Sequence, residues 1–300
     1  MADFLFFMEV LVGGLLSGIM YSLVALGFVL IYKASGVFNF AQGAMVLFAV
    51  LSFVGFMELG LPFWAALLVT IGLMVLVGMA TERFVLRPLV SQSEETLLMA
   101  TIGLTFVIEG VAQLAWGVDV RNLDLGIHDE PINWVMDATG MLISQLDIAA
   151  GIVAGVMVAS LALLFSRTKV GRGLRAVADD HAAALSIGIP LNHIWMLVWA
   201  TAGVVALVAG MLWGARSGVQ FALVWVALKA LPVLIIGGFT SVPGVIVAGL
   251  IVGAIEKLTE VYLGPYVGGG IEGWSPYMLA VLFLMFRAEG LFGEKIIRRV

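Results

Sequence analysis

Long apolar runs, separated by short polar breaks, extend over the whole chain. A bilayer core requires about 20 apolar residues per helix, so each run of that length predicts a membrane-spanning helix. The runs cover approximately residues 10–32, 37–59, 62–84, 95–116, 147–165, 191–214, 219–238, 242–263 and 274–287. We therefore expect an all-α, polytopic transmembrane helix bundle of about nine spans, within a range of roughly eight to ten.

The seventh run, 219–238, differs from the others because Lys229 and Pro232 lie inside it. Proline interrupts helix hydrogen bonding, and a charged side chain at membrane depth is costly. We expect a broken or re-entrant helix there, and the sequence leaves open whether it crosses the bilayer fully.

Small residues recur four positions apart within the runs. Such pairs let helix backbones approach closely, which matters in lipid because apolar burial no longer drives helix association. They predict tight helix packing, and the pairs are Gly14 and Gly18, Gly151 and Gly155, Gly210 and Gly214, and Gly249 and Gly253.

Composition and charge add an orientation to this pattern. The chain is 62% hydrophobic and 12% charged, whereas a soluble domain is about half apolar and about a quarter charged. Cytoplasmic loops of membrane proteins carry an excess of lysine and arginine. With the N-terminus outside and the C-terminus cytoplasmic, all but four of the 15 basic residues lie inside, and an acidic loop at about 117–147 lies outside.

Signatures of catalysis are missing from the sequence. Cysteine is absent, and neither a GxxxxGK[ST] phosphate loop nor a GxSxG nucleophile motif occurs. His128, His181 and His193 do not have the spacing of metal ligands. We therefore expect a transport protein rather than an enzyme, with no metal site.

Two ionisable side chains inside the runs are candidates for the substrate pathway, because buried charge in a membrane usually faces a cavity or the bundle interior. Glu109 shares a helix face with Gln113, and Lys229 lies midway along the seventh run. A purely structural interpretation stays open for each residue. Glu109 can be a packing residue bonded to a neighbouring hydroxyl, and Lys229 can extend to the membrane interface.

A second polar patch consists of Asn39 and Gln42, which lie on one helix face between Gly36 and Gly43. The two side chains can bind polar groups of a substrate or a water molecule. They can equally cap the cytoplasmic start of the second run.

The longest predicted inner loop, about 166–190, begins with a basic flank and contains signals for a short helix. Asp179 or Asp180 can cap its start, Gly188 suits its end, and Pro190 prevents continuation. The basic flank can bind phosphates of the inner leaflet and so anchor the loop. A rigid helix on the inner face would instead suit a separate motor subunit that pushes against it.

This loop also carries a G-x-x-L-R-A-x-A-x-D element, followed by an alanine-rich stretch and a G-I pair. It resembles the cytoplasmic coupling segment in membrane subunits of ABC importers for branched-chain amino acids. On that resemblance, we assign to the coupling segment Gly171, Arg172, Leu174, Arg175, Ala176, Asp179, Asp180, Ala184, Gly188 and Ile189.

Four further blocks are similar to this family, so the resemblance covers the chain almost completely. They are GVFNFAQG (36–43), AGVVALVAGML (202–212), LIIGGFTSVPGVIVAGLIVG (234–253) and GLFGEKIIRRV (290–300). One departure is Gln42, at a position associated with histidine in this family, which argues against a titrating imidazole there.

The resemblance implies a single permease domain over 1–300 in a bacterial inner membrane. Its implied partners are a second homologous membrane subunit, two cytoplasmic ATPases that bind ATP and magnesium, and a periplasmic solute-binding protein; no nucleic acid is involved. This chain would bind no cofactor itself. Leucine, isoleucine and valine are the leading substrates. The alternatives are urea, short amides or other amino acids, or, in a different class, a secondary transporter or channel that uses Glu109 or Lys229.

Overall fold

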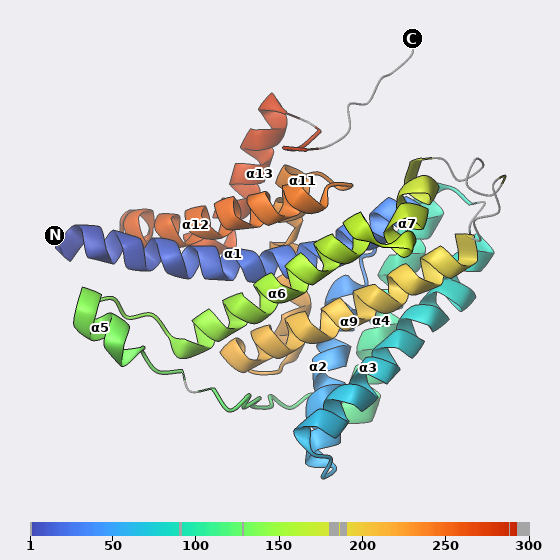
Figure 1. The fold of residues 1–300 in the computed structure, drawn as a ribbon, viewed down its shortest axis with the longest axis horizontal. Coiled ribbons are helices and arrows are strands. Elements are labelled where there is room, and N and C mark those ends of the chain that lie inside the picture. The colour runs from blue at the N-terminus through green and yellow to red at the C-terminus, as the bar shows by residue number, and fades with distance from the viewer. Residues whose placement is uncertain are drawn as a thin grey trace. The chain divides into compact units, whose positions relative to one another are not determined.

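The computed structural model describes residues 2–89, 92–127, 129–179, 186, 191–287 and 289–292, and within these ranges the fold is built from helices. Figure 1 shows the helices in chain order. Their bounds are α1 Ala2–Ser35, α2 Gln42–Glu58, α3 Phe63–Ala80, η1 Thr81–Leu86, η2 Arg87–Leu89, α4 Glu94–Trp116, α5 Asn133–Thr139, α6 Gln145–Arg167, α7 Lys169–Asp179, α9 Leu191–Ser217, η3 Phe221–Leu223, α10 Val224–Lys229, α11 Leu231–Gly237, α12 Val242–Val267, η4 Ile271–Gly273 and α13 Ser275–Phe286.

Every apolar run predicted from the sequence contains helix, which confirms the polytopic helical architecture. Six helical segments within the described residues are long and apolar enough to cross a bilayer, namely Asp3–Ser35, Phe63–Leu89, Glu95–Trp116, Gln145–Arg167, Leu191–Ser217 and Val242–Val267. Three apolar segments are shorter, namely Gln42–Glu58, Phe221–Gly237 and Ser275–Phe286. The number of spans and the side of each terminus stay predictions.

The seventh run is broken, as its proline and lysine indicate. It divides into η3, α10 and α11, and α10 ends at Lys229. Pro232 lies in the first turn of α11, where its missing backbone N–H is tolerated. The loop at 117–147 contains α5, a short helix that the sequence pattern did not predict.

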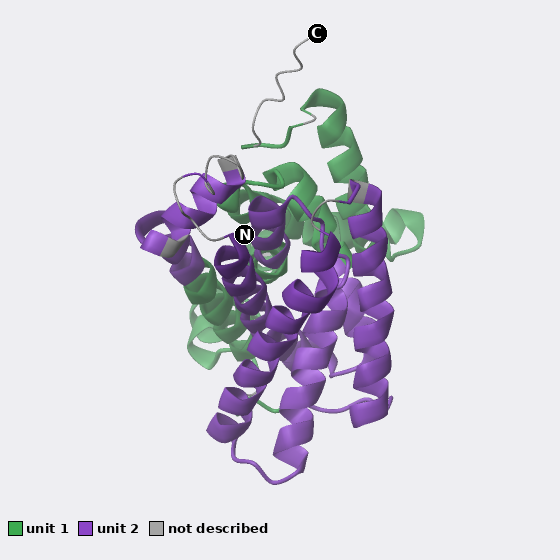
Figure 2. Ribbon diagram, turned by 90° about the vertical axis from the view of Figure 1, so that its right-hand side faces the viewer, with its two compact units in different colours: residues 1–25, 124–158, 228–300 green, residues 26–123, 159–227 purple. Residues whose placement is uncertain are grey.

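The described chain divides into two compact units, coloured separately in Figure 2. Unit 1 comprises residues 1–25, 124–158 and 228–300, and unit 2 comprises residues 26–123 and 159–227. The single domain over 1–300 stays a prediction.

Unit 2 is organised around α2, whose residues are almost all buried because α3, α4 and α9 pack against it. A helix that is apolar on all sides must be covered on all sides, and α2 fits this rule. Glycines allow the neighbouring α3 and α9 to approach closely. A Cβ on Gly203 would lie 2.6 Å from the carbonyl oxygen of Met74, and a Cβ on Gly78 would lie 2.4 Å from that of Trp199.

Unit 1 holds α1 and α12 together by backbone contact. A Cβ on Gly18 would lie 2.3 Å from the carbonyl oxygen of Gly249, and one on Gly14 would lie 2.7 Å from that of Gly253. The Ser22 hydroxyl donates across the same contact to the carbonyl of Val245, at 3.1 Å. These two glycine pairs are confirmed as packing positions.

The other two predicted pairs differ from one another. A Cβ on Gly210 would lie 2.6 Å from the carbonyl oxygen of Val46, so α9 uses this glycine for packing within unit 2. Gly151 faces the side chain of Leu16, whereas Gly155 has open space beside it. Spacing alone therefore overestimated the packing role of the pair on α6.

Candidate functional site

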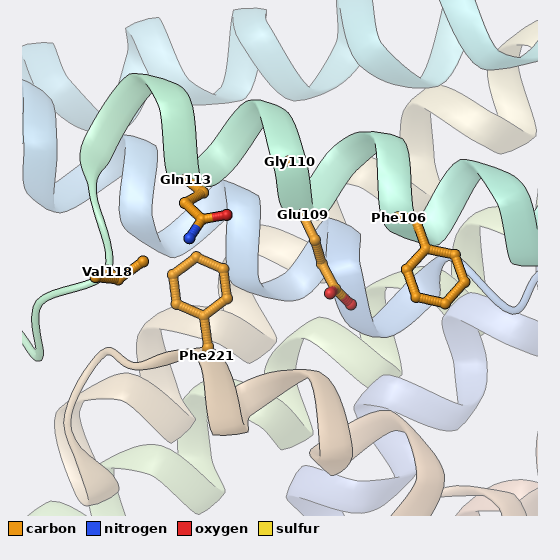
Figure 3. A pocket seen from close by; sticks show the side chains of 6 residues that line it. All are labelled: Phe106, Glu109, Gly110, Gln113, Val118 and Phe221. Carbon is orange, nitrogen blue, oxygen red and sulfur yellow. The ribbon is translucent and has the colours of Figure 1, made fainter.

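A cavity of about 480 Å³ lies beside α4 in unit 2. Glu109 and Gln113 line it together, as their spacing predicts, because residues four apart on a helix share a face. Figure 3 shows both side chains on the side of α4 that faces Phe221. The complete lining comprises Phe106, Glu109, Gly110, Gln113, Val118 and Phe221.

Two segments far apart in sequence contribute to the lining of this cavity, and a backbone bridge brings them together. Arg121 and Val219 exchange antiparallel hydrogen bonds, with N···O distances of 2.9 and 2.8 Å. The bridge holds the chain around Val118, which follows α4, near the start of η3. Phe221 opens η3 and thereby reaches the cavity.

The cavity combines one carboxylate with an amide and two aromatic rings. Glu109 is partly exposed and forms neither a hydrogen bond nor an ion pair with any described side chain. A carboxylate and nearby aromatic faces both attract cations, and the rings also accept apolar groups. The arrangement therefore suits a small molecule that carries an ammonium group and an apolar side chain.

Asn39 and Gln42 do not line this cavity. Both are completely buried, and the Asn39 amide donates to the Gln42 side-chain oxygen at 3.2 Å. The Asn39 side-chain oxygen accepts from the backbone N–H of Ala41, just before α2 begins. Gln42 Nε2 lacks a hydrogen-bond partner and packs against Gly27 of α1. These contacts stabilise the start of α2, while a role in the pathway stays a prediction.

Lys229 belongs to a second polar cluster, which lies in unit 1. Its ammonium donates to Glu256 Oε1 at 3.3 Å, and the Tyr21 hydroxyl donates to the same oxygen at 3.0 Å. Glu256 is only 3% exposed, whereas the Lys229 side chain is 34% exposed. Lys229 therefore forms an ion pair in the structure.

Glu256 was not predicted as a site residue, although the pattern on α12 carries a signal for it. Glu256 follows Gly249 by seven positions and Gly253 by three, so all three lie on one face of α12. That face was already predicted to pack closely. A carboxylate on a packed face must be buried and therefore needs a partner.

The first part of the coupling segment forms α7. Contacts within unit 2 explain the residue types of its motif. A Cβ on Gly171 would lie 1.9 Å from the carbonyl oxygen of Phe165, so only glycine fits there. Leu174 is buried at 2% exposure. The Arg175 guanidinium donates to the Phe165 carbonyl at 2.7 Å and so satisfies the end of α6. The motif therefore fixes α7 to α6.

The remaining residues of the coupling segment fall into two groups. Arg172 is exposed on α7, Ala176 is partly exposed, and Asp179 is the last residue of the helix. The other assigned residues, together with the short helix expected after them, lie outside the described residues; they are Asp180, Ala184, Gly188 and Ile189.

The chain resembles known transport proteins over its full length. Residues 10–287 match the family described as "Branched-chain amino acid transport system / permease component". The chain is 26% identical to the high-affinity branched-chain amino acid transport system permease protein BraD of Pseudomonas aeruginosa, over 100% of both chains. It is 26% identical to the corresponding protein LivH of Escherichia coli, over 99% of both.

A solved structure, PsaBC from Streptococcus pneumoniae in complex with Fab, aligns with 91% of this chain and 89% of its own, at 16% identity and a TM-score of 0.46. The family match itself covers most of the sequence and extends over both compact units. The chain therefore belongs to the family of permease components of branched-chain amino acid transport systems.

Proposed function

We propose that this chain is the membrane subunit of a bacterial ABC importer that carries leucine, isoleucine and valine across the inner membrane. Separate ATPases at the inner face drive transport, a second homologous membrane subunit completes the translocation unit, and a periplasmic binding protein delivers the substrate. The observation that carries the substrate assignment is the cavity beside α4, with its single carboxylate and two phenylalanine rings.

In this proposal Glu109 accepts hydrogen bonds from the ammonium group of the amino acid. The rings of Phe106 and Phe221 contact its branched apolar side chain, and the Gln113 amide supplies further hydrogen bonds. The site needs only weak affinity, because a transported molecule must leave it again. Asn39 and Gln42 take part indirectly, by fixing the start of α2.

We assign α7 to the contact with an ATPase. Arg175 ties α7 to the last turn of α6, and Leu174 anchors it in the interior of unit 2, so a push on α7 moves α6 with it. Arg172 and Lys169 project from this braced helix and offer positive charge to an acidic partner surface.

The test is uptake by the complex reconstituted in lipid vesicles with ATP inside and the binding protein outside. We expect leucine uptake that vanadate abolishes and a protonophore leaves unchanged. Glu109→Gln should lower uptake about tenfold, which corresponds to the loss of one charge-assisted hydrogen bond. Thr105→Val, one turn away on α4 and outside the cavity lining, is the matched control and should leave uptake unchanged.

Other outcomes point to other functions. Uptake that resists vanadate and stops with a protonophore would establish a secondary transporter instead. Vanadate-sensitive uptake of urea or short amides, without uptake of leucine, would keep the importer and overturn the substrate.

A further inference from the structure

We propose that Lys229 and Glu256 form a binding site for the zwitterionic headgroup of an amino acid. The ion pair between them opens, Lys229 binds the carboxylate of the ligand, and Glu256 binds its ammonium group. This inference rests on the proposed function and extends it, because it makes both charges of the substrate necessary and uses residues that do not line the cavity beside α4.

The cluster consists of three residues of unit 1, each on a different helix. Lys229 ends α10, directly before the break in the seventh run, while Glu256 lies near the middle of α12 and Tyr21 lies on α1. Both donors meet a single carboxylate oxygen, at 3.3 Å from Lys229 Nζ and 3.0 Å from the Tyr21 hydroxyl. Ionisable groups buried within a membrane protein usually mark a substrate or ion pathway.

The second carboxylate oxygen is the independent sign of a ligand. Glu256 Oε2 is buried and has no hydrogen-bond partner. A buried carboxylate oxygen without a donor is costly, and native structures rarely keep one without a reason. The ammonium group of an amino acid supplies the donors that this oxygen lacks.

Lys229 is the charged group of this pair that a ligand can reach. About a third of its side chain is exposed, at 34%, whereas Glu256 is 3% exposed, so a ligand meets the ammonium first. Its flexible stem allows it to turn toward a carboxylate, which exposes Glu256 to the ammonium of the same molecule. One internal ion pair is thereby exchanged for two pairs with the ligand, and Tyr21 keeps Glu256 in place.

The chain contains a matched control pair in the same unit. Lys257 donates to Glu272 at 3.2 Å, and its side chain is also 34% exposed. Glu272 is 40% exposed, however, so solvent can satisfy its oxygens. The two lysines thus share length, charge and exposure. Only Lys229 pairs with a buried carboxylate that has an oxygen without a hydrogen-bond partner.

The binding test uses the full chain in lipid nanodiscs, with the lysines reductively methylated by isotope-labelled dimethyl groups, which keep their positive charge. The sequence has five lysines, so the Lys229 resonance can be assigned with a Lys229→Arg variant. We titrate with leucine, with leucinamide, which lacks the carboxylate, and with isocaproate, which lacks the ammonium.

We expect leucine to shift the Lys229 resonance saturably, with affinity at least about tenfold above that of either analogue, and to leave Lys257 unchanged. Glu256→Gln should remove the response, whereas Glu272→Gln should keep it. A Lys229 resonance that ignores leucine, or that responds equally to isocaproate, overturns the inference.

The transport test uses the absence of cysteine from the chain. Lys229→Cys should lower leucine uptake by the reconstituted complex about tenfold, and treatment with an aminoethyl methanethiosulfonate, which restores the positive charge, should recover it. The uncharged methyl reagent should not. Undiminished uptake by the variant, equal recovery with both reagents, or no recovery in an assembled complex contradicts the proposal. A wild-type complex that carries no leucine refutes the proposed function, whereas the nanodisc titration decides this inference by itself.

Discussion

The two carboxylates Glu109 and Glu256 lie on long apolar helices, yet their surroundings differ in every respect. Glu109 is partly exposed, lines a cavity and has no bonded partner among the described side chains. Glu256 is buried and receives two donors on one oxygen. An unpaired carboxylate contributes little to stability and is available to a ligand. A buried, paired carboxylate contributes to stability through its ion pair, and it binds a ligand only when that pair opens.

This difference predicts unequal effects of the two carboxylates on folding. Removing one partner of a buried ion pair leaves an uncompensated charge, which costs several kcal/mol, while changing a partly exposed group that lacks partners costs almost nothing. The free energy of unfolding, measured by denaturation of the purified chain in detergent micelles, therefore distinguishes the two sites independently of any transport assay.

The largest effect should come from Lys229→Met. It leaves Glu256 buried without a counter-ion, and we expect a loss of about 3 kcal/mol in the free energy of unfolding, at the low end for buried pairs because Lys229 is partly exposed. Lys257→Met is the control and should cost less than about 1 kcal/mol, as exposed pairs do. Equal losses in the two variants would remove the distinction between the pairs.

Gly18→Val should cost about 2 kcal/mol through overpacking, because its Cβ would lie 2.3 Å from the carbonyl oxygen of Gly249. Separation of α1 from α12 should also weaken the Tyr21 contact with Glu256. Gly13→Val on the same helix has open space and is the control. The idea fails if Gly13→Val is the more damaging substitution.

Tyr21→Phe should cost about 1 kcal/mol, because it removes one hydrogen bond and keeps the ring. In the Lys229→Met background the same change should cost more, since Tyr21 is then the last donor to Glu256. A double-mutant cycle measures this coupling, and strict additivity would contradict a shared site.

Glu109→Gln should change the free energy of unfolding by less than about 0.5 kcal/mol. The same substitution should lower uptake about tenfold. A clear loss of stability would show that Glu109 has a structural partner and would favour the packing interpretation of this residue.

The sequence predicted the helices well, because their position follows from local apolar runs and from local interruptions such as Pro232. It also placed Glu109 and Gln113 together, since they belong to one helix face. It did not predict the partner of Lys229, which lies 27 positions away, or that of Tyr21, which lies 235 positions away. Those contacts depend on which helices pack together, and spacing within one helix carries no information about that.

The motif of α7 shows a different limit. The sequence indicated that Gly171 and Arg175 belong to a coupling segment, but it gave no reason for these two residue types. The structure supplies one, because glycine permits contact with the Phe165 carbonyl and arginine satisfies that same carbonyl. The motif assigned to docking thus also fixes α7 to α6.

The glycine contact between α1 and α12 has a consequence for biosynthesis. Tyr21 and Glu256 are separated by 235 residues. At roughly 5 to 20 residues per second, α1 leaves the ribosome about 10 to 50 s before its partner. During that interval its small-residue face has no matching surface, so α1 must wait in the bilayer or with an insertion factor. A chain truncated before α12 keeps that face uncovered, and this distinguishes an unfinished protein from a complete one.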